Sequence, residues 1–226
     1  MLSPVGMDVT SISATEIQLG KPRMRGWSHA FGAFLAVPAV YFLVDAAQED
    51  AGELGALIYG VTLVMLLGVS ATYHVPFWST AVRAKLRLLD HSMIYVLLGG
   101  SYTPFCLLTG GWVKDIVLPM VWIMSIAGVL GTLFVPDMRR SVKAGSYVAM
   151  GWISLPLAFE WYAALGQKVL FLLFVGGVIY TAGAVVYTRK SPNPSPAVFG
   201  YHEVFHLAVV VGCAVHYAAV WLTVSR

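Results

Sequence analysis

Seven long stretches of the chain are apolar and almost free of charged residues, and this pattern limits the folds that the chain can adopt. About 20 helical residues, at about 1.5 Å each, cross a hydrocarbon core of about 30 Å. Of the 226 residues, 58% are hydrophobic and 11% are charged, whereas a soluble domain carries roughly 25% charged residues. We therefore predict an all-α, polytopic integral membrane protein, a seven-transmembrane-helix bundle with spans at about residues 26–44, 54–75, 90–109, 116–136, 145–165, 169–188 and 202–224.

Outside these spans, residues 1–20 are polar and mixed in composition. They lack the basic region followed by an apolar region that a signal peptide needs, so we expect a disordered cytoplasmic tail, and a single transmembrane domain over residues 21–226. Cys106 and Cys213 lie within apolar runs, which indicates buried thiols rather than a disulfide framework. The net charge of +3 is too small to indicate a nucleic-acid partner.

The basic residues predict the orientation of the bundle, because short cytoplasmic loops are enriched in lysine and arginine. With the N-terminus in the cytoplasm, only Lys114, Lys168 and Arg226 fall outside. The other eleven of the fourteen fall inside: Lys21, Arg23, Arg25, Arg83, Lys85, Arg87, Arg139, Arg140, Lys143, Arg189 and Lys190. We expect the N-terminus inside, the C-terminus outside, and a multi-pass location in a cell membrane.

Two histidines, His202 and His206, stand four residues apart at the start of the last span. Residues at i and i+4 lie on one face of a helix, so both imidazoles can bind one metal ion. Taken alone, the pair is equally compatible with hydrogen bonds to interfacial water or backbone carbonyls.

The predicted orientation brings further polar groups to the same membrane depth. His74 ends the second span and Asp90 opens the third, both at the cytoplasmic end, where His202 and His206 also lie. Ionisable groups within spans are costly and mark functional sites. Three neutral imidazoles with an open fourth position are typical of catalytic zinc, so we predict a Zn²⁺ site on His74, His202 and His206.

Asp90 and Ser70 are the predicted catalytic residues around this metal. Asp90 would hold or deprotonate the reacting water, and Ser70, one turn before His74, could donate a hydrogen bond to water or to a substrate carbonyl. Two alternatives stay open, since Asp90 could instead pair with Arg87 at i−3, and Ser70 could bond to the carbonyls of its own helix.

The remaining polar residues of the spans have weaker claims. His29 is near enough in depth to support the site without binding metal, or to act as an interfacial anchor. His91 points about 100° away from Asp90 around the helix, and His216 lies about 15 Å deeper than His206. The negative charge of Glu203 is favoured near the N-terminus of a helix by the helix macrodipole, which explains this residue without a role at the metal.

Several motifs together resemble the hemolysin III family, the bacterial branch of the progestin and adipoQ receptors. The resemblance covers about residues 21–226 and rests on five stretches: Lys21–His29, Ser70–His74, Leu89–His91, Gly100–Phe105 and Phe199–His206. It implies a seven-helix bundle inverted relative to G-protein-coupled receptors, zinc on His74, His202 and His206, and Asp90 and Ser70 around the zinc water. Members of this superfamily include membrane-embedded ceramidases, receptors and proteins of lipid homeostasis, and the family name refers to a haemolytic activity.

The favoured function is a zinc-dependent hydrolase of lipid amides or esters, with membrane lipids as substrate or ligand and a bacterial inner membrane as its location. One alternative is a sensor or receptor in which zinc is structural. A haemolytic protein is a second alternative, with less support because no polar stripe runs the length of a span to line a pore. The oligomeric state is not predicted.

Overall fold

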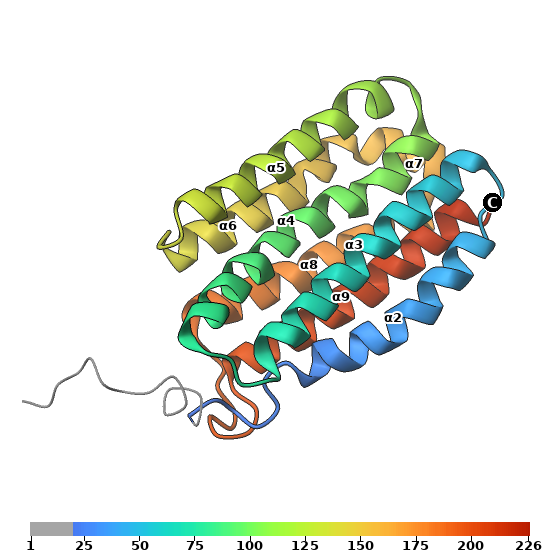
Figure 1. Cartoon of the computed structure of the whole chain (residues 1–226). Coiled ribbons are helices and arrows are strands. Elements are labelled where there is room, and N and C mark those ends of the chain that lie inside the picture. Colours follow the sequence, from blue (N-terminus) through green and yellow to red (C-terminus); the bar gives the residue numbers. More distant parts are fainter. Residues whose placement is uncertain (1–19) are drawn as a thin grey trace, which may run out of the picture.

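The structure, a computed structural model, describes residues 20–226. The tail predicted for residues 1–20 therefore lies outside the described residues, apart from Gly20. Within the described part, seven helices are long and apolar enough to cross a membrane, which confirms the predicted all-α bundle. They are α2 (Trp27–Asp45), α3 (Asp50–His74), α4 (Thr80–Thr109), the segment Val113–Phe134 that ends as α5 (Leu118–Phe134), the segment Arg140–Leu165, α8 (Gln167–Arg189) and α9 (Tyr201–Val224), as Figure 1 shows.

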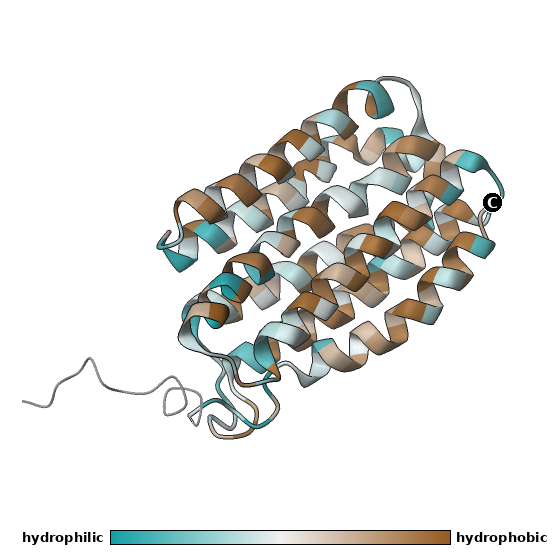
Figure 2. Ribbon diagram, in the orientation of Figure 1, coloured by the Kyte–Doolittle hydropathy of each residue, from teal (hydrophilic) through white to brown (hydrophobic). Residues whose placement is uncertain are grey.

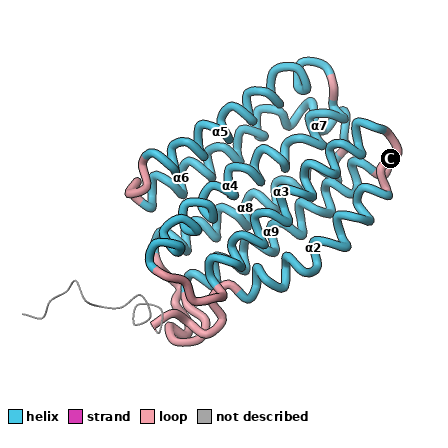
Figure 3. Tube along the Cα trace, viewed as in Figure 1, coloured by secondary structure: helices cyan, strands magenta, loops and turns pink. Residues whose placement is uncertain are grey.

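The helices run alternately in opposite directions, so that the loops gather at the two ends of the bundle (Figure 3). Hydrophilic residues concentrate at these ends, while hydrophobic residues cover the helices between them (Figure 2). Large apolar side chains point outward along the helices, including Phe34, Phe134 and Phe159, which are 75%, 79% and 80% exposed. A soluble monomer rarely exposes so continuous an apolar surface, and a lipid environment is what such a surface requires.

The segment Arg140–Leu165 is not one uniform helix, although its sequence predicts a single run. It consists of α6 (Arg140–Gly151), a 3₁₀ segment (Trp152–Leu157) and α7 (Ala158–Leu165). Pro156 lies in the 3₁₀ segment and has no N–H to donate, which breaks the α-helical ladder. The Tyr102 hydroxyl donates to the carbonyls of Met150 (3.0 Å) and Gly151 (2.8 Å), and so satisfies backbone groups beside the break.

Several pairs of helices approach each other closely at glycines, and two of these contacts lie beside the candidate site's helices. A Cβ atom added at Gly100 of α4 would lie 2.0 Å from the Thr62 hydroxyl oxygen of α3. One added at Gly176 of α8 would lie 2.2 Å from the His216 ring of α9. Only glycine permits these contacts, so α3 with α4, and α8 with α9, form two tightly packed pairs.

One end of the bundle collects the chain segments that surround the candidate site. There the segment before α2, the α3–α4 loop and the α8–α9 connector lie together (Figure 1). The backbone N–H of Arg23 donates to the carbonyl of Ala197 and that of Met24 to the carbonyl of Val198, both at 3.0 Å. The N-terminal segment is thereby joined to the connector that leads into α9.

Candidate metal centre

Three imidazoles converge at this end of the bundle. His74 is the last residue of α3, and His202 and His206 occupy the first two turns of α9. The start of α9 is fixed locally, because the Glu203 carboxylate accepts a hydrogen bond from the Gly200 backbone N–H at 2.7 Å. This bond satisfies one backbone N–H at the helix start and fixes where the helix begins, and hence which face His202 and His206 share.

The geometry of the three rings suits a shared metal ion. Ring centroids are 4.9 Å apart for His74 and His202, 4.7 Å for His74 and His206, and 4.6 Å for His202 and His206. One nitrogen from each ring can be chosen so that all three lie within 4.8 Å of one another. Nitrogens about 2.1 Å from one tetrahedral zinc ion lie about 3.4 Å apart, so the rings need to close by up to about 1.4 Å.

The hydrogen bonding of these residues also fits a metal site. His74 Nε2 and His206 Nδ1 are buried and have no hydrogen-bond partner among residues 20–226. Buried polar atoms in native proteins are almost always paired, so two unpartnered imidazole nitrogens within one cluster call for a ligand from outside the chain. His74 and His206 are only 8% and 2% exposed. Three imidazole nitrogens form a ligand set that zinc commonly binds.

Asp90 and Ser70 lie beside the histidines, as their predicted roles require. The Asp90 carboxylate oxygen Oδ2 is 3.7 Å from His74 Nε2, and the Asp90 side chain is 14% exposed. Ser70, which is 2% exposed, lies one turn before His74 on α3. Within the described chain no ion pair joins Asp90 to Arg87, so the alternative of a simple surface pair loses its basis.

The sequence did not predict the buried ion pair that lies next to the histidines. The Arg25 guanidinium binds the Glu203 carboxylate, whose side chain is 3% exposed. Glu203 thus has two specific partners, Arg25 and the Gly200 N–H, in addition to the macrodipole interaction expected from sequence. This pair ties the segment before α2 to the first turn of α9, between the two histidines of that helix.

Lys21 caps the other ligand-bearing helix. Its ammonium group donates to the carbonyls of His74 (3.0 Å) and Val75 (2.8 Å), where α3 ends, and lies 4.2 Å from the centre of the Phe77 ring. Unpaired carbonyls at a helix C-terminus favour a cation. Partial burial, with the positive charges of Arg83 and Arg25, lowers the pKa of Lys21 from its ordinary value.

The other three histidines occupy different positions. His29 packs against the ring of His206 but does not belong to the three-histidine set. The backbone carbonyl of His91 accepts a hydrogen bond from Tyr147 at 3.2 Å. His216 Nε2 lies 3.4 Å from the Leu173 carbonyl, at mid-helix and away from the site.

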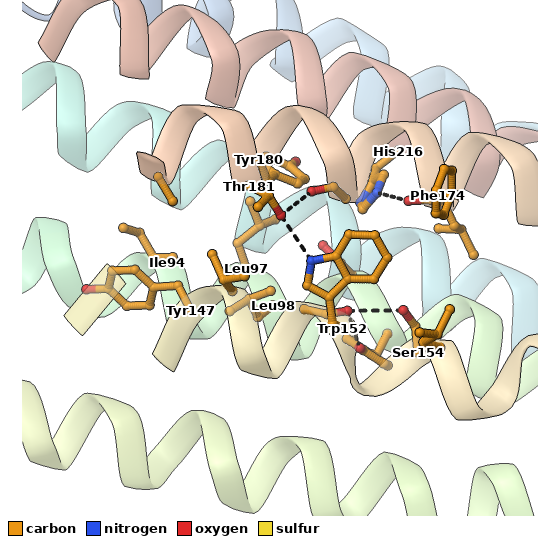
Figure 4. A pocket seen from close by; sticks show the side chains of 18 of the residues that line it. Ile94, Leu97, Leu98, Tyr147, Trp152, Ser154, Phe174, Tyr180, Thr181 and His216 are labelled. Atoms are coloured by element: carbon orange, nitrogen blue, oxygen red, sulfur yellow. Dashed lines mark hydrogen bonds between the residues drawn. The ribbon is translucent and has the colours of Figure 1, made fainter. Parts of the chain in front are cut away.

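A mostly apolar cavity begins one turn from the candidate site and lies between α3, α4, α6, α7, α8 and α9. Three of its lining residues are near the site: Leu66 is one turn from Ser70, Ile94 is one turn from Asp90, and Phe205 adjoins His206. At its far end Trp152 donates to the Thr181 hydroxyl at 3.0 Å, with His216 and Phe174 nearby (Figure 4). Since ten residues of α9 separate His206 from His216, the cavity extends about 15 Å along the helix.

Comparisons with known proteins agree with the resemblance drawn from the motifs. A family model described as "Haemolysin-III related" matches residues 17–217. The chain is 31% identical to "Hemolysin-3" of Bacillus cereus, over 85% of this chain and 87% of that protein. It is 29% identical to the human "Monocyte to macrophage differentiation factor" (86% and 82% covered) and 27% identical to the Drosophila melanogaster "Adiponectin receptor protein" (84% and 48% covered).

Proposed function

Because the chain belongs to the haemolysin-III-related family of multi-pass integral membrane proteins, with bacterial homologues, we propose that it is a zinc-dependent hydrolase of membrane lipids, cleaving an amide or an ester bond. The observation that carries the proposal is the meeting of three buried imidazoles, an adjacent carboxylate and an apolar cavity that starts one turn away. The lipid head group would lie at the histidines and its acyl chain in the cavity. The family likeness and the printed names of the relatives support a membrane role, while the chemistry is argued from the site.

His74, His202 and His206 would hold the metal. Zinc bound by three neutral imidazoles acts as a Lewis acid, which polarises a carbonyl and lowers the pKa of water. Asp90 is the group to accept the proton of the attacking water, because its carboxylate is the nearest to His74, at 3.7 Å from Nε2. The proton then passes to the leaving amine or alkoxide as the carbonyl–nitrogen or carbonyl–oxygen bond breaks, and a free carboxylic acid is the second product. The Ser70 hydroxyl orients the Asp90 carboxylate or donates to the substrate carbonyl.

We also propose that the site faces the cytoplasm of a bacterial inner membrane. Eight of the fourteen basic residues lie in the segment before α2 (Lys21, Arg23 and Arg25), in the first turns of α4 (Arg83, Lys85 and Arg87) and where α8 ends (Arg189 and Lys190), at the end of the bundle that holds the histidines. The excess of lysine and arginine at this end supports an inside location, with the C-terminus outside. A substrate would then reach the site from the inner leaflet.

The test combines metal analysis with product detection. Purified protein is analysed for bound metal and incubated with a panel of ceramides, phospholipids and acyl amides, beside Asp90→Asn and His206→Ala. We expect about one zinc per chain and turnover in wild type, zinc without turnover in Asp90→Asn, and neither in His206→Ala. Zinc retained at full occupancy by His206→Ala would remove His206 from the ligand set.

A lipid sensor or receptor with structural zinc is the second candidate. It is favoured by the fact that the three histidines come from only two helices, α3 and α9, which a bound metal would cross-link. In that case Asp90→Asn keeps both the metal and the biological output, whereas catalysis predicts that the output disappears. A haemolytic function, which the name of the Bacillus cereus relative indicates for that protein, is tested by lysis of erythrocytes with purified protein.

A further inference from the structure

A fourth imidazole, His29, lies against the candidate metal centre without joining it. It occupies the first turn of α2 and is 3% exposed. Its ring lies parallel to that of His206, with centroids 4.0 Å apart and an interplanar angle of 6°. The ring planes of the three candidate ligands instead make angles of 59° to 69° with one another. Among these four imidazoles, His29 is therefore the one that stacks face to face on His206.

His206 lacks the support that a metal-binding histidine usually has. Such a histidine almost always donates its second ring N–H to a carboxylate, a carbonyl or a water, and this bond fixes the plane of the ring. Within residues 20–226, His206 Nδ1 is buried without a hydrogen-bond partner. The ring of His29 is the nearest of the rings that contact His206, at 4.0 Å between centroids, and the only one that lies parallel to it among the described residues.

His29 is held mainly by packing. Neither ring nitrogen has a hydrogen-bond partner of good geometry among the described residues, although the His206 backbone interacts with the ring. One turn on, Gly32 brings α2 against Leu67 of α3 and Val210 of α9, at 3.4 Å and 3.6 Å from the position of a Cβ. Further along, the Tyr217 hydroxyl of α9 donates to the Ala39 carbonyl of α2 at 2.7 Å. The His29 ring thus stands on a helix that is fixed to both ligand-bearing helices.

We propose that His29 is a positioning residue of the metal centre, which acts through its aromatic face by holding the ring of His206 in the plane needed to bind the ion. The inference rests on the proposed metal site and concerns neither the substrate nor the hydrolysis. An imidazole that binds a metal ion becomes electron-poor, and the face of a neutral aromatic ring attracts such a group. The stack therefore strengthens when metal binds and also keeps His206 from turning its ligand nitrogen away.

Two substitutions separate the face of His29 from its nitrogens. His29→Phe keeps an aromatic face and removes both nitrogens. His29→Leu still fills the space with a side chain but removes the aromatic face as well as the nitrogens. His216→Leu is the matched control, because it makes the same change at a buried histidine about 15 Å away along α9. Zinc affinity of the full-length protein in detergent is measured by competition with a chelator, and the Co²⁺-substituted proteins are compared by their visible absorption spectra.

We expect His29→Leu to weaken zinc binding about 10- to 100-fold, and His29→Phe and His216→Leu to stay within about threefold of wild type. The Co²⁺ bands should shift in His29→Leu alone. Unchanged affinity in His29→Leu overturns the proposal, and so does a loss in His29→Phe as large as in His29→Leu, because the nitrogens and not the face would then matter. Should His29→Leu fail to give a monodisperse protein, His29→Met is measured in its place with the same expectation.

Failure of the metal site itself gives a different result. If wild type binds no zinc, or if His206→Ala binds zinc as wild type does, the proposed metal centre is wrong whatever His29 does. If His206→Ala loses zinc while His29→Leu keeps it, only the role of His29 is wrong.

Discussion

Removal of Arg25 should destabilise the protein by several kcal/mol, because it leaves a buried carboxylate without its counter-charge. The Glu203 side chain is 3% exposed and that of Arg25 is 19% exposed, and Arg25 is its only ion-pair partner among the described residues. Breaking a buried ion pair by removing one partner costs about 3–5 kcal/mol. The partial exposure of Arg25 places the expected cost of Arg25→Gln near the lower end, about 3 kcal/mol.

The assay is thermal unfolding in detergent, followed by circular dichroism at a fixed heating rate. For a chain of 150–250 residues about 1 kcal/mol corresponds to about 2–4 °C, so Arg25→Gln should unfold about 6–12 °C below wild type. Arg23→Gln is the matched control, since it removes the same charge from the same segment and Arg23 is exposed. The backbone bond of Arg23 to Ala197 is unaffected by this change.

The double variant Arg25→Gln/Glu203→Gln tests the physical cause. It removes both charges, and the amide oxygen at position 203 can still accept the hydrogen bond of the Gly200 N–H. We expect it to recover at least half of the loss seen in Arg25→Gln, because the uncompensated charge is gone. A melting temperature of Arg25→Gln within about 2 °C of wild type, or a double variant no more stable than the single one, would refute the reasoning.

Three further predictions concern packing, the cavity and the metal. Gly100→Ala should lower the melting temperature strongly, because its Cβ meets the Thr62 hydroxyl at 2.0 Å, whereas Gly145→Ala, with open space around it, should be neutral or stabilising by about 0.5–1 kcal/mol. Ala184→Trp should fill the apolar cavity and abolish lipid turnover while bound zinc, measured by metal analysis, stays at the wild-type level. Removal of zinc with a chelator should lower the melting temperature of wild type but not of His206→Ala, because only a folded site gains from binding.

The sequence predicts the seven helices well because each span must be long and apolar enough to cross a bilayer. It predicts their ends less well. Helix α4 begins at Thr80, ten residues before the start expected at residue 90, because a helix can continue beyond the hydrocarbon core into the charged segment around Arg83. Hydropathy locates the membrane-embedded part of a helix and not its hydrogen-bonded ends.

The candidate site is likewise predicted from the sequence only in part. The four-residue spacings of Ser70 with His74 and of His202 with His206 are local, so sequence alone places each pair on one helix face. The pairing of Arg25 with Glu203 joins residues 178 positions apart, and the stack of His29 on His206 spans almost as much of the chain. Such contacts depend on how α2 crosses α9. The one available signal was the presence of an ionisable residue near the start of each helix.

The glycine contacts of the bundle have a mechanical consequence for the metal centre. Gly100 holds α4 tightly to α3, and Gly176 holds α8 tightly to α9. His74 and Asp90 belong to the first pair, and His202 and His206 belong to the second. Because α2 packs on both α3 and α9, a displacement of one pair against the other would strain the contacts of α2 as well as change the spacing of the three rings.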